Sequence, residues 1–372
     1  MTERSEPSER TVYDVAVIGA GPAGTQAAVS AAHQLRHVLV LDAAPISQRK
    51  GRAYWSKSVE IVDAPVFTRI TGPRFMQALH HWLNAWPVRT VTIGRRARRT
   101  GIERRAGVVL RLRRTPALSG EFAPVGHLFE LEASTRPLRD RRPVAVARFY
   151  ARAVVIASGF EDVWPDIEID ESAQRLYRRY RTVFRYAGNR KGWHVCIRCD
   201  GHLHVDEHLA ILATGDLAWG IVRGAQDFTS RMTILTHGRP HGLSEEQLAL
   251  LARLNVEIVP ERIVAHIGKG TDLLGLRFAD GSERFFDGYF LDLGLVPNTG
   301  FLKPEDGWSL QTDEDGLLVV NEDGQVLDRS GAPVPGVFAA GDVVAGQRNL
   351  IATAFGLGQN AGLAASDLMR EW

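Results

Sequence analysis

The sequence predicts an α/β fold with two domains, of which the second is inserted in the first. A short apolar run at 12–18 ends in glycines and is followed by a helical pattern and a second apolar run at 37–41. This order is typical of a strand–helix–strand unit. A second such unit begins at 209–212 and ends at 232–236. The length of 372 residues also fits two domains better than one core.

The elements outside these units follow the same reasoning. Residues 71–82 are expected to form a turn and an amphipathic helix, because apolar side chains recur there at helical intervals: Phe75, Leu79, Trp82 and Leu83. Strand patterns fill the segment up to 159 and return in the last third, before a helix expected from about Asn349 to Trp372. The expected domains are 1–163 together with 288–372, and the inserted 164–287.

Composition excludes several classes of protein. Hydrophobic residues make up 45% of the chain and charged residues 24%, and no apolar stretch is long enough to span a membrane, so a soluble protein is expected. The first ten residues, MTERSEPSER, lack the apolar run of a secretory signal, which predicts a short disordered lead and a cytoplasmic location. A net charge of +2 gives no indication of nucleic acid or an anionic membrane as partner.

Charge is concentrated between Arg95 and Arg114, where nine arginines occur. A turn is expected at Thr100–Gly101, and apolar residues alternate with arginines at 108–113. Two interpretations stay open. The segment is a β-ribbon with one solvated basic face, or it is a docking surface for an acidic electron-donor protein.

A glycine-rich turn connects the first predicted strand to its helix: Gly19-Ala20-Gly21-Pro22-Ala23-Gly24. Gly19 permits a tight turn, Gly21 lets a pyrophosphate approach the backbone, and Gly24 allows close packing of helix and strand. The helix N-terminus offers free N–H groups to phosphates. Asp42 closes the next strand and can accept hydrogen bonds from a ribose. The turn therefore predicts a Rossmann-like, three-layer ββα nucleotide-binding domain.

The chain contains two cysteines, Cys196 and Cys199, which are too few and too close for a structural disulfide framework. Such a pair can close a small disulfide ring, and a nearby cation or helix N-terminus would lower the pKa of one thiol. Candidate cations are His194, Arg198 and His202. The spacing therefore indicates redox chemistry.

A zinc knuckle is the alternative, because five possible ligands fall within eleven positions: His194, Cys196, Cys199, His202 and His204. The continuation Asp200-Gly201 and the two flanking strand–helix–strand units have no place in such a module. We therefore expect no metal, with His202 and His204 at the surface or behind the reacting groups.

At this point the sequence resembles the low-molecular-weight thioredoxin reductases, which are class II FAD-dependent pyridine nucleotide-disulfide oxidoreductases. The family's motifs occur in order across nearly the whole chain: the Gly19 turn, Ile70-Thr-Gly-Pro73, Ala157-Ser-Gly159, Cys196-Ile-Arg-Cys-Asp-Gly201, Gly294-Leu-Val-Pro-Asn-Thr299 and Gly341-Asp342. The resemblance implies FAD as cofactor, a homodimer, and a thioredoxin-like protein or a small dithiol or disulfide as partner.

The resemblance also implies roles for single residues. Ala157 and Gly159 would line the FAD site, and Asp342, after Gly341, would bind the ribityl chain or a phosphate. The helix N-terminus near Asn349 and Leu350 would stabilise a reduced, anionic flavin. Cys199 would lie next to the flavin and Cys196 would react with the substrate. Asp200 would assist proton transfer.

The second nucleotide loop departs from the family pattern. It contains 213–218 with Asp216 near the expected phosphates, where a carboxylate and a pyrophosphate compete for one helix N-terminus. The basic run that binds the 2′-phosphate of NADPH is reduced to Thr236-His237-Gly238-Arg239, and no acid that would suit NADH closes the strand. NADPH is therefore doubtful. The segment 95–150 is an additional departure.

Three functions remain open. In the first, the chain is a thioredoxin-reductase-like flavoenzyme that uses NADPH poorly and acts either as a dithiol oxidase or as a reductase that receives electrons from a protein or a second flavin. In the second, it is an NADPH-thioredoxin reductase with a degenerate NADPH site. In the third, it is a flavin-binding redox sensor without turnover. A second flavin is considered because Trp219 lies just beyond the loop and could stack on a ring, although a tryptophan there is more often part of a core.

Overall fold

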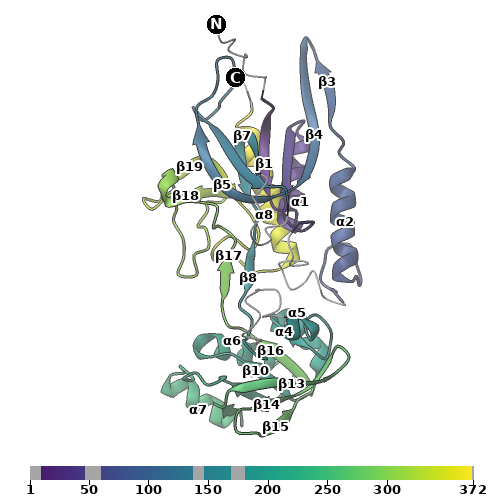
Figure 1. Cartoon of the computed structure of the whole chain (residues 1–372), viewed down its shortest axis with the longest axis vertical. Coiled ribbons are helices and arrows are strands. Elements are labelled where there is room, and N and C mark those ends of the chain that lie inside the picture. The colour runs from purple at the N-terminus through teal and green to yellow at the C-terminus, as the bar shows by residue number, and fades with distance from the viewer. Residues whose placement is uncertain (1–9, 47–59, 137–145, 169–180, 371–372) are drawn as a thin grey trace. The chain divides into compact units, whose positions relative to one another are not determined.

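The computed structural model describes residues 10–46, 60–136, 146–168 and 181–370. These residues form two compact units (Figure 1). The first unit contains 10–46, 74–136, 146–160 and 297–370, and the second contains 60–73, 161–168 and 181–296. The predicted N-terminal lead lies outside the described residues apart from Arg10. None of the helices in these described ranges is long and apolar enough to cross a membrane.

The first unit is built on a nine-stranded sheet with the central order β18-β19-β7-β1-β2-β4-β3. Its strands are β1 (Val12–Ile18), β2 (His37–Asp42), β3 (Arg89–Ile93), β4 (Arg96–Ala106), β5 (Val108–Thr115), β6 (Leu128–Ser134), β7 (Val146–Ile156), β18 (Gln325–Leu327) and β19 (Pro333–Ala339). Its helices are α1 (Pro22–His33), α2 (Gly72–Asn84, which begins at the unit boundary), η3 (Pro304–Asp306) and α8 (Ile351–Asp367).

Alternation along β1 explains the layers of this unit. Val15 and Val17 face the apolar cluster that contains α1 and α8, whereas Ala16 and Ile18 face the cluster that contains β5 and β6. Successive side chains of a strand point to opposite faces, so a central strand buried on both faces is apolar throughout. Helices cover one face and a β-layer the other, which confirms the predicted three-layer domain.

The turn predicted at Thr100–Gly101 is wrong, because both residues lie inside β4. The first half of β4 pairs with β3 in antiparallel fashion and the second half pairs with β2 in parallel fashion. Gly101, with φ +110°, stands where the partner changes, and a Cβ there would overlap the Pro87 carbonyl. Glycine is needed at this position because other residues rarely adopt such a φ.

The segment 95–150 is part of the first unit's sheet wherever the structure describes it. β4 extends the parallel sheet, and β5, β6 and the first half of β7 form an antiparallel meander on it. β7 continues from this meander into the central sheet, where residues 154–156 pair with both β1 and β19.

The second unit repeats the layers of the first. The parallel sheet β12-β11-β10-β16-β9 has an antiparallel sheet, β13-β14-β15, on one face and helices on the other. Its elements are α4 (Arg181–Arg185), β9 (Trp193–His194), α5 (Ile197–Asp200), η2 (Gly201–His204), β10 (Leu209–Leu212), α6 (Gly215–Ala225), β11 (Met232–Leu235), α7 (Glu245–Arg253), β12 (Glu257–Val259), β13 (Ile263–Lys269), β14 (Asp272–Phe278), β15 (Glu283–Phe285) and β16 (Gly288–Leu291).

The strands β8 (Phe160–Asp162) and β17 (Leu295–Pro297) pair with each other where the chain passes between the units. The sequence placed the second boundary at 287/288, whereas the structure divides the chain at 296/297. The difference arises because β16 pairs with β10 and so belongs to the second unit's sheet. A four-residue apolar strand offers no signal that tells one parallel sheet from another.

Candidate functional site

The residues expected to hold a nucleotide come together at one edge of the first unit's sheet. β19, β7, β1 and β2 are neighbouring parallel strands. Gly341, Ala157, Gly19 and Asp42 stand at or directly after their carboxyl ends. In parallel α/β sheets this edge is where ligands bind. The structure therefore gathers four motifs that lie far apart in the sequence.

The glycine turn has the packing that its sequence predicts. A Cβ at Gly19 would overlap the Ala157 carbonyl, and one at Gly24 would overlap the Gly19 carbonyl. Gly21, by contrast, has no atom within 4 Å of an added Cβ, so the space in front of it is open. Gly21 is also the N-cap of α1, and no side chain caps this helix end. The turn thus leaves helix N–H groups and open space where a pyrophosphate would bind.

The residues that follow β7 form hydrogen bonds with Asn298, where the chain comes back into the first unit. The Asn298 side chain donates a hydrogen bond to the Ser158 carbonyl (3.1 Å), and its backbone N–H donates to the Gly159 carbonyl (2.9 Å). The Ser158 hydroxyl is buried and has no hydrogen-bond partner among the described residues. A buried hydroxyl without a partner is costly, and a polar group of a bound ligand would satisfy it.

Asp42 is buried and already engaged. Its Oδ1 accepts from the Ala44 backbone N–H (2.9 Å), and its Oδ2 accepts two bonds from the Arg104 guanidinium (3.1 and 2.5 Å). Arg104 also lies 3.1 Å from His80 Nε2. The expected ribose contact would use the remaining lone pairs of this carboxylate. No sequence pattern indicates the Arg104 partner, which is 62 residues away from Asp42.

Asp342 has the features of a ligand-binding carboxylate. Among the described residues no hydrogen bond reaches it, and burial raises its pKa to about 6. The nearby N-terminus of α8 begins after Leu350, which is its N-cap and provides no side-chain cap, while Asn349 is exposed. An unpartnered acceptor next to an uncapped helix end fits the ribityl hydroxyls and the negative charge of a reduced flavin.

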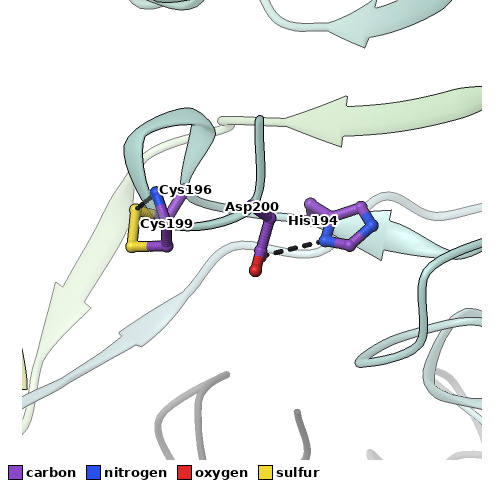
Figure 2. The surroundings of a disulfide bond; sticks show 4 residues. All are labelled: His194, Cys196, Cys199 and Asp200. Atoms are coloured by element: carbon purple, nitrogen blue, oxygen red, sulfur yellow. Dashed lines mark hydrogen bonds and ion pairs between the residues drawn. A yellow bond between two sulfur atoms is a disulfide. The ribbon is translucent and has the colours of Figure 1, made fainter. Parts of the chain in front are cut away.

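The two cysteines form a disulfide in the second unit (Figure 2). Cys196 is the N-cap of α5, and its sulfur accepts the Cys199 backbone N–H at 3.1 Å. Both residues are half-buried, and Arg198 between them is exposed. Glycine follows at position 201 because a Cβ there would overlap the Phe228 ring. The Cys-x-x-Cys-Asp-Gly motif thus folds into one tight turn against the protein interior.

Asp200 points at a buried histidine rather than at solvent. Its Oδ2 lies 2.9 Å from His194 Nδ1, and Figure 2 shows the two side chains facing one another. His194 Nε2 lies 3.3 Å from His204 Nε2, and His204 Nδ1 lies 2.7 Å from Glu207 Oε2. His202 is exposed, as expected. His204, which was expected at the surface or behind the reacting groups, is completely buried.

Neither cysteine is in a metal-binding arrangement. No group of three or more His, Cys, Asp or Glu side chains that could hold a metal ion occurs within the described ranges. Both sulfur atoms of the zinc-knuckle alternative are bonded to each other.

The second nucleotide loop uses its polar groups internally. The His237 Nδ1 accepts the Ile263 backbone N–H (3.0 Å), so its Nε2 carries the proton that it donates to Asp166 Oδ1 (2.6 Å). This hydrogen bond holds the pKa of Asp166 below its usual value. Asp216, at the start of α6, accepts from Gln247. Trp219 packs partly buried against the helix-side core of this unit.

The model of the pyridine nucleotide-disulphide oxidoreductase family matches residues 13–358. The chain belongs to this family. Its members are FAD-dependent oxidoreductases. In this chain the two cysteines that the sequence singled out are joined in a disulfide. The glycine turn, Ser158 and Asp342 fit that cofactor.

Similar proteins extend this picture of the pyridine nucleotide-disulphide oxidoreductase. A Pseudomonas putida protein that is part of an alkyl hydroperoxide reductase is 24% identical over 96% of the chain, and an NADH dehydrogenase of Bacillus subtilis is 24% identical over 99%. The chain spans 58% and 61% of these relatives. Thioredoxin reductases of Streptococcus pyogenes (TM-score 0.73, 20% identity) and Giardia duodenalis (TM-score 0.70, 19% identity) share the fold, each over 97% of this chain and 99% of theirs.

Proposed function

We propose that this enzyme exchanges electrons between FAD at the Gly19 turn and the Cys196–Cys199 pair, and that NADPH is a poor electron donor for it. When bound, FAD supplies two-electron chemistry. Cys196 would react with the substrate dithiol or disulfide, Cys199 would face the flavin, and Asp200 would donate or accept the proton at sulfur. A thioredoxin-like protein or a small dithiol fits this pair as substrate.

The state of His237 carries the proposal on NADPH. A 2′-phosphate needs cations that are free to meet it. His237 is buried and neutral in its hydrogen-bonding pattern, with one ring nitrogen accepting from Ile263 and the other donating to Asp166. Binding a phosphate would require breaking both bonds. Asp216 adds a negative charge at the helix end where the pyrophosphate would lie.

An NADPH-thioredoxin reductase is the second candidate, because two exposed arginines flank this position. Arg239 follows His237 in the same turn, and Arg262 lies 3.7 Å from Asp166. The Cβ of Arg262 also comes within 3.6 Å of a Cβ placed on Gly238. These guanidinium groups could replace the missing basic run. Their exposure and their acidic neighbour favour the weaker binding that we propose.

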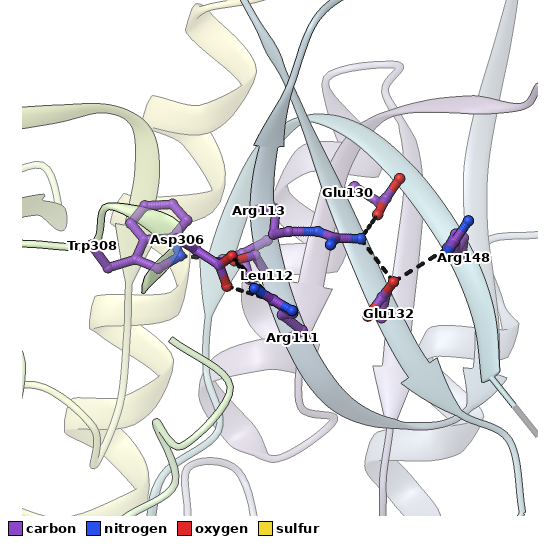
Figure 3. Close-up of polar contacts among 8 residues, drawn as sticks. All are labelled: Arg111, Leu112, Arg113, Glu130, Glu132, Arg148, Asp306 and Trp308. Carbon is purple, nitrogen blue, oxygen red and sulfur yellow. Dashed lines mark hydrogen bonds and ion pairs between the residues drawn. The ribbon is translucent and has the colours of Figure 1, made fainter. Parts of the chain in front are cut away.

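The electron source is then another dithiol, a protein or a second flavin. A dithiol oxidase would pass its electrons to oxygen. An acidic donor protein would meet fewer unpaired arginines on the meander, because some of them form ion pairs within the chain. Figure 3 shows Arg111 bound to Asp306 and Arg113 bound to Glu130 and Glu132. Exposed arginines of the β3–β4 hairpin include Arg95 and Arg99.

Anaerobic stopped-flow mixing tests the proposal. Dithiothreitol should bleach the flavin absorption, and NADPH should do so slowly, with little preference over NADH. Rapid bleaching by micromolar NADPH with clear selectivity over NADH would instead establish the conventional reductase. Arg239→Glu separates the two candidates further: it should slow reduction by NADPH only if that arginine binds the 2′-phosphate. A protein that turns over with none of the donors and acceptors would be a redox sensor.

A further inference from the structure

We propose that Asp200, His194, His204 and Glu207 form a proton relay between the Cys196–Cys199 pair and solvent. The inference rests on the proposed function, in which Asp200 is the acid that serves the sulfur atoms. The relay adds three residues that act through Asp200. It also provides a route by which protons reach the Asp200 carboxylate, which is buried in the second unit.

The four side chains make an unbroken series of contacts. The distances are 2.9 Å from Asp200 Oδ2 to His194 Nδ1, 3.3 Å between the two Nε2 atoms, and 2.7 Å from His204 Nδ1 to Glu207 Oε2. The side chains of His194 and His204 are 2% and 0% exposed, and that of Asp200 is 9% exposed. Glu207 is 25% exposed, so it is the end of the series that meets water.

Counting protons shows that the series can carry one. Each of these three contacts joins two atoms that repel each other unless a proton lies between them, so the series holds three protons. The Arg190 carbonyl, 3.1 Å from His194 Nε2, favours the arrangement in which His194 Nε2 carries the proton that it shares with His204. Two neutral imidazoles supply only two, and the third sits on one of the carboxyl groups or makes one ring an imidazolium. If every proton crosses its own contact, Glu207 loses one proton and Asp200 gains one. No side chain has to move.

The surroundings favour transfer toward Asp200. Arg190 Nη2 donates to Glu207 Oε1 at 2.5 Å, so a positive charge lies next to the Glu207 end of the series. Burial lowers the pKa of the His204 imidazole, so a proton that arrives there is readily passed on. Charged groups that face the two rings include Asp200, Glu207 and Arg190, and close neighbours include the Phe290 ring and the Arg190 carbonyl, 3.1 Å from His194 Nε2.

The relay serves a balanced reaction with a soluble dithiol. A thiolate of the dithiol bonds to Cys196 sulfur, the Cys196–Cys199 bond breaks, and its electron pair stays on Cys199. Cys199 takes a proton from Asp200, and a replacement enters at Glu207. The second thiol of the dithiol then displaces Cys196, which is protonated in turn. The soluble dithiol is oxidised to its disulfide and releases two protons, and the protein's disulfide is reduced with the uptake of two.

The test follows this reaction without using flavin turnover. Oxidised protein is mixed with dithiothreitol without oxygen, quenched with acid and alkylated, and its free thiols are counted by mass spectrometry. Glu207→Gln keeps the hydrogen bonds but cannot carry a proton, and His194→Phe keeps the stack on Phe290. Each should slow reduction about tenfold, because a positioned acid contributes about 100-fold or more and water replaces it in part. The solvent deuterium isotope effect should rise, and added imidazole buffer should restore the rate of Glu207→Gln.

The matched control is His208→Gln, a half-buried histidine of the same unit whose Nε2 contacts Thr233 instead. Its rate should equal that of the unmodified protein. The equilibrium potential of the disulfide should stay constant in Glu207→Gln, because a relay alters rates alone. If Glu207→Gln matches the unmodified protein in rate, pH profile and isotope effect, the relay is wrong and the proposed function stands. If dithiothreitol does not reduce the unmodified protein, the proposed function fails and the relay with it.

Discussion

Gly358 of α8 lies directly against Ala23 of α1, so closely that a Cβ on Gly358 would overlap the Ala23 carbonyl oxygen. One turn further on, Gly362 meets Ala27 in the same way. The two helices therefore touch backbone to backbone at the end where α1 follows the glycine turn. This contact fixes the positions of both helix N-termini that are expected to face the flavin.

Gly358→Ala should separate these helices. We expect a loss of about 1–3 kcal/mol in the free energy of unfolding, as for other overpacked cores, together with weaker FAD binding. Gly356→Ala is the control, because Gly356 lies on the same helix with no atom within 4 Å of an added Cβ. It should stabilise the helix by up to about 1 kcal/mol. Urea unfolding with a flavin titration checks both, and equal effects would contradict the close contact.

Gly21→Val should abolish FAD binding without destabilising the flavin-free protein. The open space in front of Gly21 accepts the side chain, and its extended backbone suits valine, but the pyrophosphate loses its place. Gly19→Ala should instead destabilise the flavin-free protein, because the φ of +112° and the Ala157 carbonyl both oppose a Cβ at this position. Thermal unfolding of the flavin-free proteins separates the two cases. Normal flavin content in Gly21→Val would refute the site.

Asp342→Asn should stabilise the flavin-free protein above about pH 6 while weakening FAD binding. Burial raises the folded-state pKa of Asp342 to about 6, above the 3.8 of an ordinary aspartate, so the ionised carboxylate disfavours folding. This group's contribution to stability therefore falls as the pH rises from about 4 to 6 and is constant above, by at most about 3 kcal/mol. The gain from Asn should vanish near pH 4, which urea unfolding across this range checks. A gain that does not depend on pH would contradict this origin.

Cys199→Ser should remove the thiolate-to-flavin charge-transfer absorption, whereas Cys196→Ser should keep or enhance it and stop turnover. The reason is the proposed division of roles, in which Cys199 faces the flavin and Cys196 faces the substrate. Absorption spectra of the two variants provide the comparison, recorded with oxidised flavin and at a pH high enough to ionise the remaining thiol, because a single-cysteine variant has no disulfide to reduce. Identical spectra would mean that the roles are assigned wrongly.

Sequence patterns predicted the parts of this protein that depend on local chemistry. The apolar runs of β1 and β2, the glycine turn and the cysteine motif all lie where the residues indicated. They did not predict ion pairs and hydrogen bonds between residues that lie far apart in the sequence. Arg111 meets Asp306 195 positions away, and Trp308 donates to the Leu112 carbonyl, as Figure 3 shows, so part of the charge of the basic segment is paired within the chain. Charge counts cannot reveal such partners.

The error at Thr100–Gly101 and the complete burial of His204, for which the sequence had left open the surface or a place behind the reacting groups, have a related cause. Glycine after threonine is typical of a turn, but here the positive φ of Gly101 lets one strand change partners within a sheet. The sequence around His204 contains no pattern that would predict its complete burial. Its burial depends on the bond to Glu207 and on Phe290, which packs against its ring. Phe290 is 86 positions away from His204 in the sequence, so the contact between them depends on the fold of the second unit. A cytoplasmic location and a homodimer stay predictions.

All nine strands of the first unit's sheet come from residues before 157 or after 324. The chain leaves and re-enters this unit at adjacent points, where the Asn298 N–H bonds to the Gly159 carbonyl at 2.9 Å. Most of the unit that contains the cysteines, 161–296, is thus a single excursion of the chain, although this unit also includes 60–73. A short turn in place of 161–296 would break no hydrogen bond of the first unit's sheet, so that sheet does not depend on the excursion for its pairing.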